Sequence, residues 1–447
     1  MDDIHLTMEQ VEAIDHLYEH DHTLLIAPTG AGKTVICLTT VHELIEGSEL
    51  RRVIVAAPAR VVEQMVWPNE AAKWEHLRGL TVLQLEGTSQ QRIKQLLSCP
   101  SDIIVVSLNN LAWLLEQDHG ADGIIIDEIS KASGKWTQGL KSKKRAGCFK
   151  WRVGMTATPV SQDFTKVWAM ARILDGGAAL GTNKSQFMER YFYSDYMGHN
   201  WTLREGADAQ IMSAVSGLVH ALEDDKASQL PKLRERERRF KMPTETREAY
   251  DEMRKDMVIE ALDTDAANEA VKSGKLRQLA SGFIYKQVIE TGPSGKPITK
   301  TVLDHTFDSA RAAEAVEWRR TLGRRKGIIF YEFTEQCEML RARLINTTES
   351  VEAFKQGPRD ILLAQINSLS HGVDGLQDVC SDVLFFHPMW SRDAYTQARD
   401  RIWRTGQRRE VTSTVLVCEN TLDDLVLERV EDRGVWMEKF MQHLRGE

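Results

Sequence analysis

The chain has 447 residues, and its 57 lysines and arginines against 65 aspartates and glutamates give a formal net charge of -8. A hydrophobic share of 42% with 27% charged residues is typical of a globular protein, which excludes a wholly disordered, collagenous or coiled-coil chain. The length suits two or three domains. No run of about 18 apolar residues occurs, so no membrane span is predicted, and the acidic, polar first ten residues are not those of a secretory signal.

The cysteines and the net charge give two further expectations. Six scattered cysteines form no CxxC pair, which argues against a disulfide framework or a zinc site and favours a reducing cytoplasm. The acidic balance, taken alone, argues mildly against nucleic acid as a partner. Net charge averages over the whole surface, however, and basic residues cluster locally in this chain.

Short apolar runs alternate with amphipathic stretches through the first half of the chain. Between the runs, apolar residues recur at three- and four-residue steps, as in residues 35–45, which is the period of a helix. Strand and helix in alternation predict a parallel sheet covered by helices on both faces. The predicted strands are Thr23–Ala27, Val53–Ala57, Thr81–Leu85, Ile103–Val106, Ile124–Ile126 and Val153–Thr156.

The same pattern returns late in the chain, after a mostly helical and charged region at about residues 160–320. Within that region, the four residues from Gly292 to Gly295 lie between two β-rich arms and predict a hairpin over Val288–Val302. The whole therefore reads as two α/β lobes joined through a helical region. The predicted strands of the second lobe are Gly327–Phe333, Ile361–Ala364, Val383–Phe386 and Val415–Cys418.

A glycine-rich loop stands between the first predicted strand and the first helical pattern. Gly30 and Gly32 allow the backbone to curl so that its N–H groups face an anion. Lys33 would reach the outer phosphates of a nucleotide, and Thr34 could ligate Mg²⁺. The alternative is a glycine turn that happens to precede Lys-Thr, which the strand before it and the helix after it disfavour. The loop consists of Ala27, Pro28, Thr29, Gly30, Ala31, Gly32, Lys33 and Thr34.

Two carboxylates follow the buried strand at residues 123–126. Asp127 would hold Mg²⁺ through water, and Glu128 would orient or deprotonate an attacking water. An Asp-Glu pair after a strand is by itself more often a solvated loop. Its agreement in order and topology with the glycine-rich loop favours the catalytic interpretation.

A third motif lies in the second lobe, at residues 397–407, which open on a helical pattern and end at a glycine turn. Arg401 and Arg404 are three residues apart, so we expect them to share a helix face. Phosphoryl transfer needs positive charge on the developing phosphate, which arginine supplies with rigid, always-charged geometry. The alternative is a basic surface helix, which most arginine-rich helices are.

Together these motifs resemble those of the superfamily-two helicase-like ATPases, and among them the Swi/Snf group. The form QAxxRxxRxGQ at residues 397–407 is the most discriminating, since it is characteristic of Swi/Snf proteins and not of DEAD-box RNA helicases. The resemblance runs from Leu6 to about Val417, and the chain is similar to the compact phage and bacterial members. Further similar motifs begin at Leu6, Val53, Ile104 and Gly154.

The resemblance implies an α/β fold of two tandem RecA-like lobes, each a parallel sheet flanked by helices, with a helical insertion or linker region. Lobe 1, which binds ATP, would span residues 1–230. Lobe 2, the helicase C-terminal lobe with the arginine fingers, would span residues 231–447. ATP and Mg²⁺ would be the cofactors, and Gln10 would contact the adenine. Thr156, Thr158 and Gln397 would couple the nucleotide site to lobe movement.

Nucleic-acid contacts are expected at two kinds of place. The stretch from Lys131 to Arg152 is basic, contains no acidic residue and interleaves aromatic side chains, so it could neutralise phosphates; a solvated loop is the alternative. A second basic cluster, from Arg319 to Lys326, suits a helix end about as well as DNA. The candidate DNA contacts are Pro58, Arg60, Ser107, Asn109, Lys131, Lys141, Lys143, Lys144, Arg145 and His371.

The leading functional hypothesis is a DNA-stimulated ATPase that translocates on duplex DNA and remodels or displaces what is bound there. The duplex could be plain or branched. A strand-separating DNA or RNA helicase is the enzymatic alternative, and a nucleotide-gated DNA-binding scaffold with little turnover is the alternative from another class. A separate nuclease or recruiting protein is a possible partner, no membrane is expected, and the compartment would be bacterial or phage-infected host cytoplasm.

Overall fold

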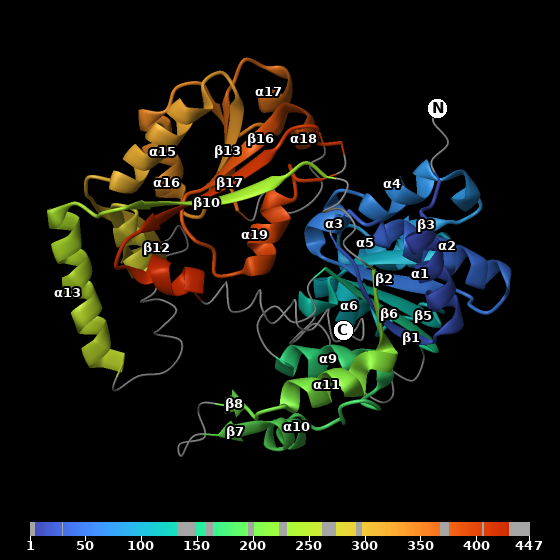
Figure 1. The fold of residues 1–447 in the computed structure, drawn as a ribbon. Helices are drawn as coiled ribbons and strands as arrows, with labels where there is room; N and C mark the ends of the chain where they lie inside the picture. The colour runs from blue at the N-terminus through green and yellow to red at the C-terminus, as the bar shows by residue number, and fades with distance from the viewer. Residues whose placement is uncertain are drawn as a thin grey trace. The chain divides into compact units, whose positions relative to one another are not determined.

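The computed structural model describes residues 5–28, 30–131, 149–157, 164–194, 201–222, 230–261, 274–291, 297–366, 375–404 and 406–428. These residues divide into two compact units, one ending at Leu222 and the other beginning at Leu230 (Figure 1). Each unit is built on its own sheet and is described by itself. Within the described part of the chain, no helix is long and apolar enough to cross a bilayer.

The first unit contains a parallel sheet with the strand order β3-β4-β2-β5-β6-β1-β9 among the residues described. The six strands predicted for this half of the chain are all present. The added edge strand β9 lies in the region that was expected to be mostly helical. The strands are β1 (His22–Ile26), β2 (Val53–Ala57), β3 (Val82–Gln84), β4 (Ile103–Ser107), β5 (Gly123–Asp127), β6 (Trp151–Thr156) and β9 (Val219–Ala221).

Helices cover both faces of this sheet, which explains why its strands read as continuous apolar runs. One face packs against α1 (Met8–Glu19), α2 (Lys33–Glu46), α3 (Ala59–Glu63) and α4 (Val66–Lys73). The other packs against α5 (Ser89–Ser98), α6 (Leu108–Leu114), α9 (Phe164–Asp175), α10 (Lys184–Tyr191) and α11 (Ala207–Val215). Neighbouring residues of one strand enter different cores, as Ile54 and Val55 do. A short hairpin, β7 (Phe192–Ser194) and β8 (Trp201–Leu203), follows α10.

A stack of three histidines joins α1 to the edge strand β9. The ring centroids of His16 and His20 lie 4.0 Å apart, and those of His16 and His220 lie 4.4 Å apart. Burial, with the neighbouring His220 and His20, lowers the pKa of His16 to about 4. Burial also lowers the pKa of His220, which Glu12 opposes. The folded protein therefore holds the His16 imidazole neutral.

This stack predicts a loss of stability in mild acid. Because the folded-state pKa of His16 lies below its usual 6.5, the unfolded chain takes up a proton first as the pH falls. The stabilisation is complete above about pH 6.5 and is lost progressively towards pH 4. We expect the urea midpoint of the wild type to fall more between pH 7 and pH 5 than that of His16→Gln. Equal falls in the two proteins would contradict the prediction.

The second unit contains another parallel sheet, with the order β10-β17-β16-β13-β15-β14 in the described residues. The four strands predicted here are present, although β16 begins three residues and β17 four residues earlier than predicted. The strands are β10 (Leu233–Phe240), β13 (Lys326–Tyr331), β14 (Thr347–Thr348), β15 (Ile361–Gln365), β16 (Cys380–Phe385) and β17 (Val411–Cys418).

Helices again cover both faces of the second sheet. One core includes side chains of α13 (Thr244–Ala261), α15 (Ala310–Leu322), α16 (Thr334–Arg343) and a helix over residues 274–280. The other includes side chains of α17 (Val351–Gln356), α18 (Leu376–Val379) and α19 (Arg392–Arg399). The unit is therefore also a doubly covered α/β layer, and the predicted fold class of two parallel α/β sheets flanked by helices is confirmed.

Strand β10 corrects the expectation of a mostly helical region at residues 160–320. Its sequence is almost entirely charged, so it lacks the apolar run by which a buried strand is recognised. It forms an edge of the sheet, where charges protect against pairing with other chains. Arg234 pairs with Glu410, Arg238 with Glu314 and Glu235 with Arg399, so tertiary ion pairs accommodate the pattern.

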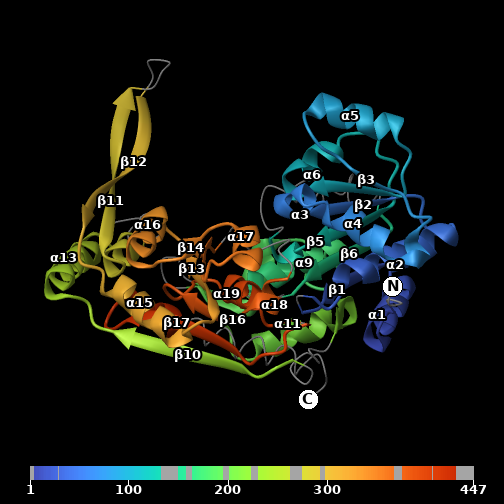
Figure 2. The same cartoon turned by 90° about the horizontal axis from the view of Figure 1, so that it is seen from above.

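The predicted hairpin is present and is longer than expected. It consists of β11 (Phe283–Thr291) and β12 (Pro297–Thr306), which pair antiparallel, and its turn at residues 292–296 lies outside the described residues. Figure 2 shows the two strands extending away from the helices at their base. Lys286 and Asp304 form an ion pair of 2.7 Å across the ribbon.

Candidate functional site

The predicted nucleotide site of the first unit assembles at the carboxyl edge of its sheet. The glycine-rich loop follows β1, Asp127 ends β5, and Thr156 ends β6, which lies between them. In open parallel sheets this is the edge at which ligands bind. The strand order therefore brings together residues that lie about 100 positions apart in the chain.

The loop has the backbone that its glycines predict. Gly30 and Gly32 have φ angles of 80° and 85°, in the left-handed region that favours glycine. Gly32 is the N-cap of α2 and supplies no side-chain cap to the first turn of the helix. The first N–H groups of α2 are therefore available to an anion, with the helix dipole behind them. Thr29 lies outside the described residues.

The Lys33 ammonium is held by the loop itself. Its Nζ donates to the carbonyl oxygens of Ala27 at 2.7 Å and Pro28 at 3.1 Å. Burial lowers the pKa of Lys33, and the carboxylates of Glu128 and Asp127 oppose that shift. An ammonium has three donors, so a third N–H remains for an acceptor such as a phosphate oxygen.

Gln10 packs directly on the loop. Its Nε2 donates to the Ala31 carbonyl at 3.0 Å, and its Oε1 accepts from the Thr7 backbone N–H in a capping box at the start of α1. A Cβ at Gly32 would lie 2.3 Å from Nε2, so the close approach requires glycine there. One amide hydrogen of Gln10 stays available, which suits the predicted contact with adenine.

Asp127 is a half-buried carboxylate at the end of β5. Burial raises its pKa to about 6, with a further rise from Glu128, while Lys33 and the indole of Trp67 lower it. The fully buried Trp67 favours the charged form, although its N–H makes no hydrogen bond of ordinary geometry. A carboxylate that is largely ionised at neutral pH suits a divalent cation.

Glu128 and Thr156 complete this edge of the sheet. Glu128 has a φ of 56°, unusual for a residue with a side chain, and such backbone is concentrated at functional sites. The buried Thr156 donates through Oγ1 to Oγ of Ser130 at 3.3 Å, so a hydroxyl contact links the end of β6 to the turn after the carboxylates. Thr158 lies outside the described residues.

The candidate DNA contacts that the structure describes follow strands at the same edge. Pro58 is the N-cap of α3 after β2, with Arg60 in that helix, and Ser107 ends β4, with Asn109 in the first turn of α6. Ser107 is buried and its Oγ accepts from Asn110, so its hydroxyl is already engaged. Lys131 is exposed after the carboxylates. Lys141, Lys143, Lys144, Arg145 and His371 lie outside the described residues.

The second unit corrects the prediction for Arg401 and Arg404, which do not share a helix face. Helix α19 ends at Arg399, and the chain continues in turns, with the N–H of Arg401 on the Ala398 carbonyl and that of Ile402 on the Arg399 carbonyl. The three-residue spacing predicted a continuing helix, but tertiary contacts bend the chain here. Arg401 is buried, with 9% of its surface exposed, and Arg404 is partly exposed.

Two polar side chains hold these turns. Trp403 donates through Nε1 to the Pro231 carbonyl at 2.8 Å. Gln407 donates through Nε2 to the carbonyls of Cys380 and Ile402, and its Oε1 accepts from the backbone N–H groups of Arg408 and Arg409. Gln397 is also buried, on the last turn of α19. We call residues 387–407 the arginine segment.

A comparison with protein families decides what these two units are. The SNF2-related domain matches residues 9–289, which is more than half of the chain. The chain belongs to the SNF2-related family. It is therefore a helicase-like ATP hydrolase of the DNA-stimulated kind, as its motifs predicted.

Individual proteins are similar to this SNF2-related chain over most of its length. It is 28% identical over 441 residues to putative protein p41 of Acyrthosiphon pisum secondary endosymbiont phage 1, covering 93% of each chain. It is 22% identical to a DNA repair and recombination protein RAD54-like of Danio rerio, covering 90% of this chain and 61% of that one. The Sulfolobus solfataricus SWI2/SNF2 ATPase core in complex with dsDNA is 18% identical, with coverages of 98% and 93% and a TM-score of 0.45.

The residues of the SNF2-related nucleotide site fit ATP with a divalent cation. The glycine loop and the N-terminus of α2 offer backbone donors and Lys33 an ammonium, while Asp127 offers carboxylate oxygens and Thr34 a hydroxyl. These are the donor types that phosphates and Mg²⁺ require. Nucleotide use thus follows from both the family and the chemistry of the edge.

The second basic cluster, from Arg319 to Lys326, is largely committed to contacts inside the second unit of this SNF2-related protein. Arg319 pairs with Asp360, Arg325 with Asp382, and Lys326 donates to the Phe354 and Gly357 carbonyls. Lys326 begins β13, so the cluster lies at the amino edge of the sheet, whereas the arginine segment starts at the carboxyl edge. The structure therefore favours the alternative of a basic helix end over a DNA contact.

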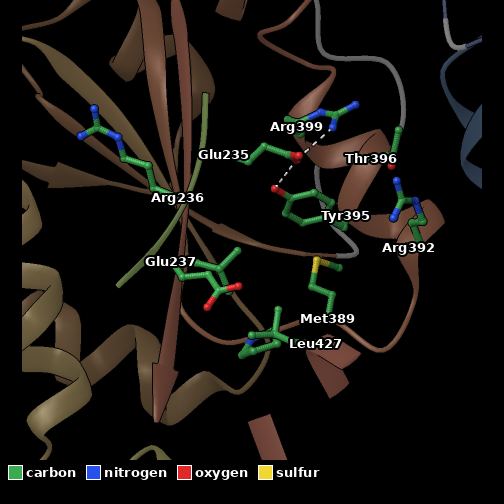
Figure 3. A pocket seen from close by; sticks show the side chains of 11 residues that line it. Glu235, Arg236, Glu237, Met389, Arg392, Tyr395, Thr396, Arg399 and Leu427 are labelled. Carbon is green, nitrogen blue, oxygen red and sulfur yellow. Dashed lines mark hydrogen bonds and ion pairs between the residues drawn. The ribbon is translucent and has the colours of Figure 1, made fainter. Parts of the chain in front are cut away.

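Sequence reasoning missed several residues that this unit uses. A cavity of about 190 Å³ is lined by residues of β10 and α19, and Glu235 accepts hydrogen bonds there from Tyr395 at 2.9 Å and Arg399 at 3.1 Å. Figure 3 shows these side chains. These bonds fasten α19 to a strand about 160 residues earlier. No local pattern marks Glu235, because its partners are far away in the chain. Trp67 and Gln407 lie within motifs of the Swi/Snf resemblance. The sequence does not show which groups they contact, and only the structure does.

Proposed function

We propose that this protein is a DNA-stimulated ATPase that translocates on double-stranded DNA and remodels or displaces what is bound there. One observation supports it most: the glycine loop, Lys33, Asp127 and Glu128 meet at the carboxyl edge of the first sheet in a member of the SNF2-related family. In this proposal residues 1–230 form the ATP-binding lobe and residues 231–447 the lobe that carries the arginine fingers.

The residues of the first unit bind and orient the nucleotide. The N–H groups of the loop and Lys33 hold the phosphates, and Gln10 contacts the adenine. Asp127 and Thr34 hold Mg²⁺, which supplies charge neutralisation on the phosphates. Glu128 follows β5 and has a left-handed backbone conformation. It orients the attacking water and accepts its proton.

The second unit supplies the remaining positive charge. Arg401 and Arg404 stabilise the charge that develops on the transferred phosphoryl group, when closure of the lobes on ATP brings them to it. Hydrolysis releases that closure, and Thr156, Thr158 and Gln397 couple the nucleotide state to the movement. If the two lobes bind the DNA backbone with unequal strength in the two nucleotide states, each cycle would then move the protein along DNA.

Duplex DNA is the proposed track because a curated relative over most of the chain is a DNA repair and recombination protein. Pro58, Arg60, Ser107, Asn109 and Lys131 follow strands at the nucleotide edge and would contact the backbone, together with the basic residues 141–145 and His371. Phosphate contacts position a protein on DNA without reading sequence. Because the net charge is -8, we expect DNA to bind only where basic residues cluster on the surface, and this binding to be sensitive to salt.

One experiment tests this function against its alternatives. ATP turnover is measured without nucleic acid and then with single-stranded DNA, duplex DNA, forked DNA and RNA. We expect the greatest stimulation by duplex DNA, and displacement of a blocking protein or third strand without release of the duplex strands. Efficient strand release from a fork would make the protein a helicase. Negligible turnover under all conditions would make it a nucleotide-gated scaffold.

A further inference from the structure

A buried arginine lies where the arginine segment leaves the second sheet. Arg277 stands on the helix over residues 274–280, just before β11, and only 7% of its surface is exposed. Its guanidinium lies at the carboxyl ends of two central strands, where Glu332 follows β13 and His387 follows β16. None of the motifs that mark the ATPase includes it as a nucleotide contact.

The guanidinium bonds to three groups at once. Its Nη1 lies 2.7 Å from Oε2 of Glu332, while its Nη2 lies 2.5 Å from Nδ1 of His387 and donates to the Pro388 carbonyl at 3.0 Å. Nδ1 of the neutral imidazole accepts from Arg277 when the ring proton is on Nε2, and it also lies 3.1 Å from the Pro388 carbonyl, to which it donates in the other tautomer. Nε2 lies 3.3 Å from Oε2 of Glu332. Burial, Arg277 and Arg311 hold the pKa of His387 well below its usual value, in agreement.

Packing alone does not fix the chain on this side. A cavity of about 160 Å³ lies beside the three groups and is lined by Arg277, Glu332, Gln365, His387, Trp390 and Ser391, among others. Side chains bordering a cavity lose part of their packing contacts. The path from β16 to α19 is thus held by the bonds from Arg277 to His387 and Pro388, together with the Arg311 bond to the Phe386 carbonyl and the buried Met389. Buried ion pairs seldom add net stability, and specifying one geometry is a recognised use of them.

We propose that Arg277 is a positioning residue for catalysis: it fixes the start of the arginine segment, as Gln407 fixes its end, and so sets where Arg401 and Arg404 stand. The inference rests on the proposed function of those two arginines. Glu235 holds the middle of the segment through Tyr395 and Arg399. The segment is therefore fastened at two places by side chains from distant parts of the chain and at its end by its own Gln407.

The test compares two arginine-to-lysine substitutions at opposite ends of β16. Arg277→Lys keeps the charge beside Glu332 but loses the fork that reaches His387 and Pro388 together. We expect a folded protein whose kcat for ATP falls about tenfold while its KM changes less than about twofold, as displacement of catalytic groups produces. Arg325→Lys is the control, because Nη1 of Arg325 donates to both carboxylate oxygens of Asp382 near the other end of the strand. Its kcat should equal that of the wild type.

Combined substitutions separate positioning from general weakening. If Arg277 acts through Arg401 and Arg404, Arg277→Lys should reduce kcat no further once Arg401→Ala and Arg404→Ala are both present. A multiplicative loss, or a wild-type kcat in folded Arg277→Lys, would overturn the proposal. If Arg404→Ala itself kept full kcat, the arginine-finger function would fail instead. Should Arg277→Lys not fold, His387→Phe, which removes the ring nitrogen that Arg277 contacts, is measured in its place, and a wild-type kcat there would equally overturn the proposal.

Discussion

Replacing Lys33 with alanine should abolish ATP turnover and leave the protein folded. In the proposed function its ammonium, held by the glycine loop, binds the phosphates, and removal of one such preorganised donor typically costs a factor of about 100 to 1000 in kcat. Stability should not fall, because the substitution removes a desolvated ammonium whose pKa burial already lowers. Turnover is measured with and without duplex DNA, and thermal unfolding is followed on the same samples.

The control is Lys73→Ala, which removes a lysine of the same unit that pairs only with Glu70 on the surface of α4. Such exposed pairs contribute little, so turnover and unfolding temperature should match the wild type. Wild-type turnover in Lys33→Ala would refute the assignment of the nucleotide site. A loss of folding would show that the ammonium serves the structure of the loop.

Replacing Arg404 with alanine should reduce hydrolysis far more than ATP binding. An arginine that acts on the transition state contributes a factor of about 1000 or more to kcat, whereas the first unit holds the bound nucleotide without it. We expect a kcat reduced at least 100-fold, with the affinity for a fluorescent ATP analogue within about twofold of the wild type. Equal losses in kcat and affinity would argue against a role in the transition state.

Arg408→Ala provides the matched control for Arg404. It removes the same side chain four residues later, from an exposed position in the chain that Gln407 holds. Turnover is measured without DNA, so that the control reports on catalysis and not on phosphate contacts with DNA. It should stay at the wild-type value. A loss as large as that of Arg404→Ala would mean that general positive charge, and not one placed guanidinium, supports the reaction.

Local sequence patterns were sufficient to predict the structure where the residues that make a feature are consecutive or close in the chain. The glycine loop needs consecutive residues between a strand and a helix, and the buried strands need consecutive apolar residues, so both were predicted with nearly the observed bounds. The hairpin at residues 283–306 was found for the same reason, since its pairing is between neighbours. The same local logic failed at β10, where an edge position and ion pairs with distant partners permit a strand of charges.

The arginine segment shows the other limit. A three-residue spacing on a helical pattern predicts a shared face, but the helix ends at Arg399 because Gln407 and Trp403 bond to Cys380 and Pro231. The sequence left the second basic cluster open between a helix end and a DNA contact, because its neutralising carboxylates come from later in the chain, Asp360 just before β15 and Asp382 in β16. In each case the deciding partner lies tens of residues or more away in the chain.

The sequence by itself determined the family, the two parallel sheets and the chemical parts of the nucleotide site, because these depend on residue types at short, fixed spacings. Only the tertiary structure decided that Gln10 rests on the glycine loop, that Arg401 and Arg404 stand in turns, and that Arg277 fixes the path leading to them. Those facts depend on contacts between segments that lie far apart in the chain, and no periodic pattern in the sequence marks which distant segments meet. Strand order in a folded sheet is what brings such segments together.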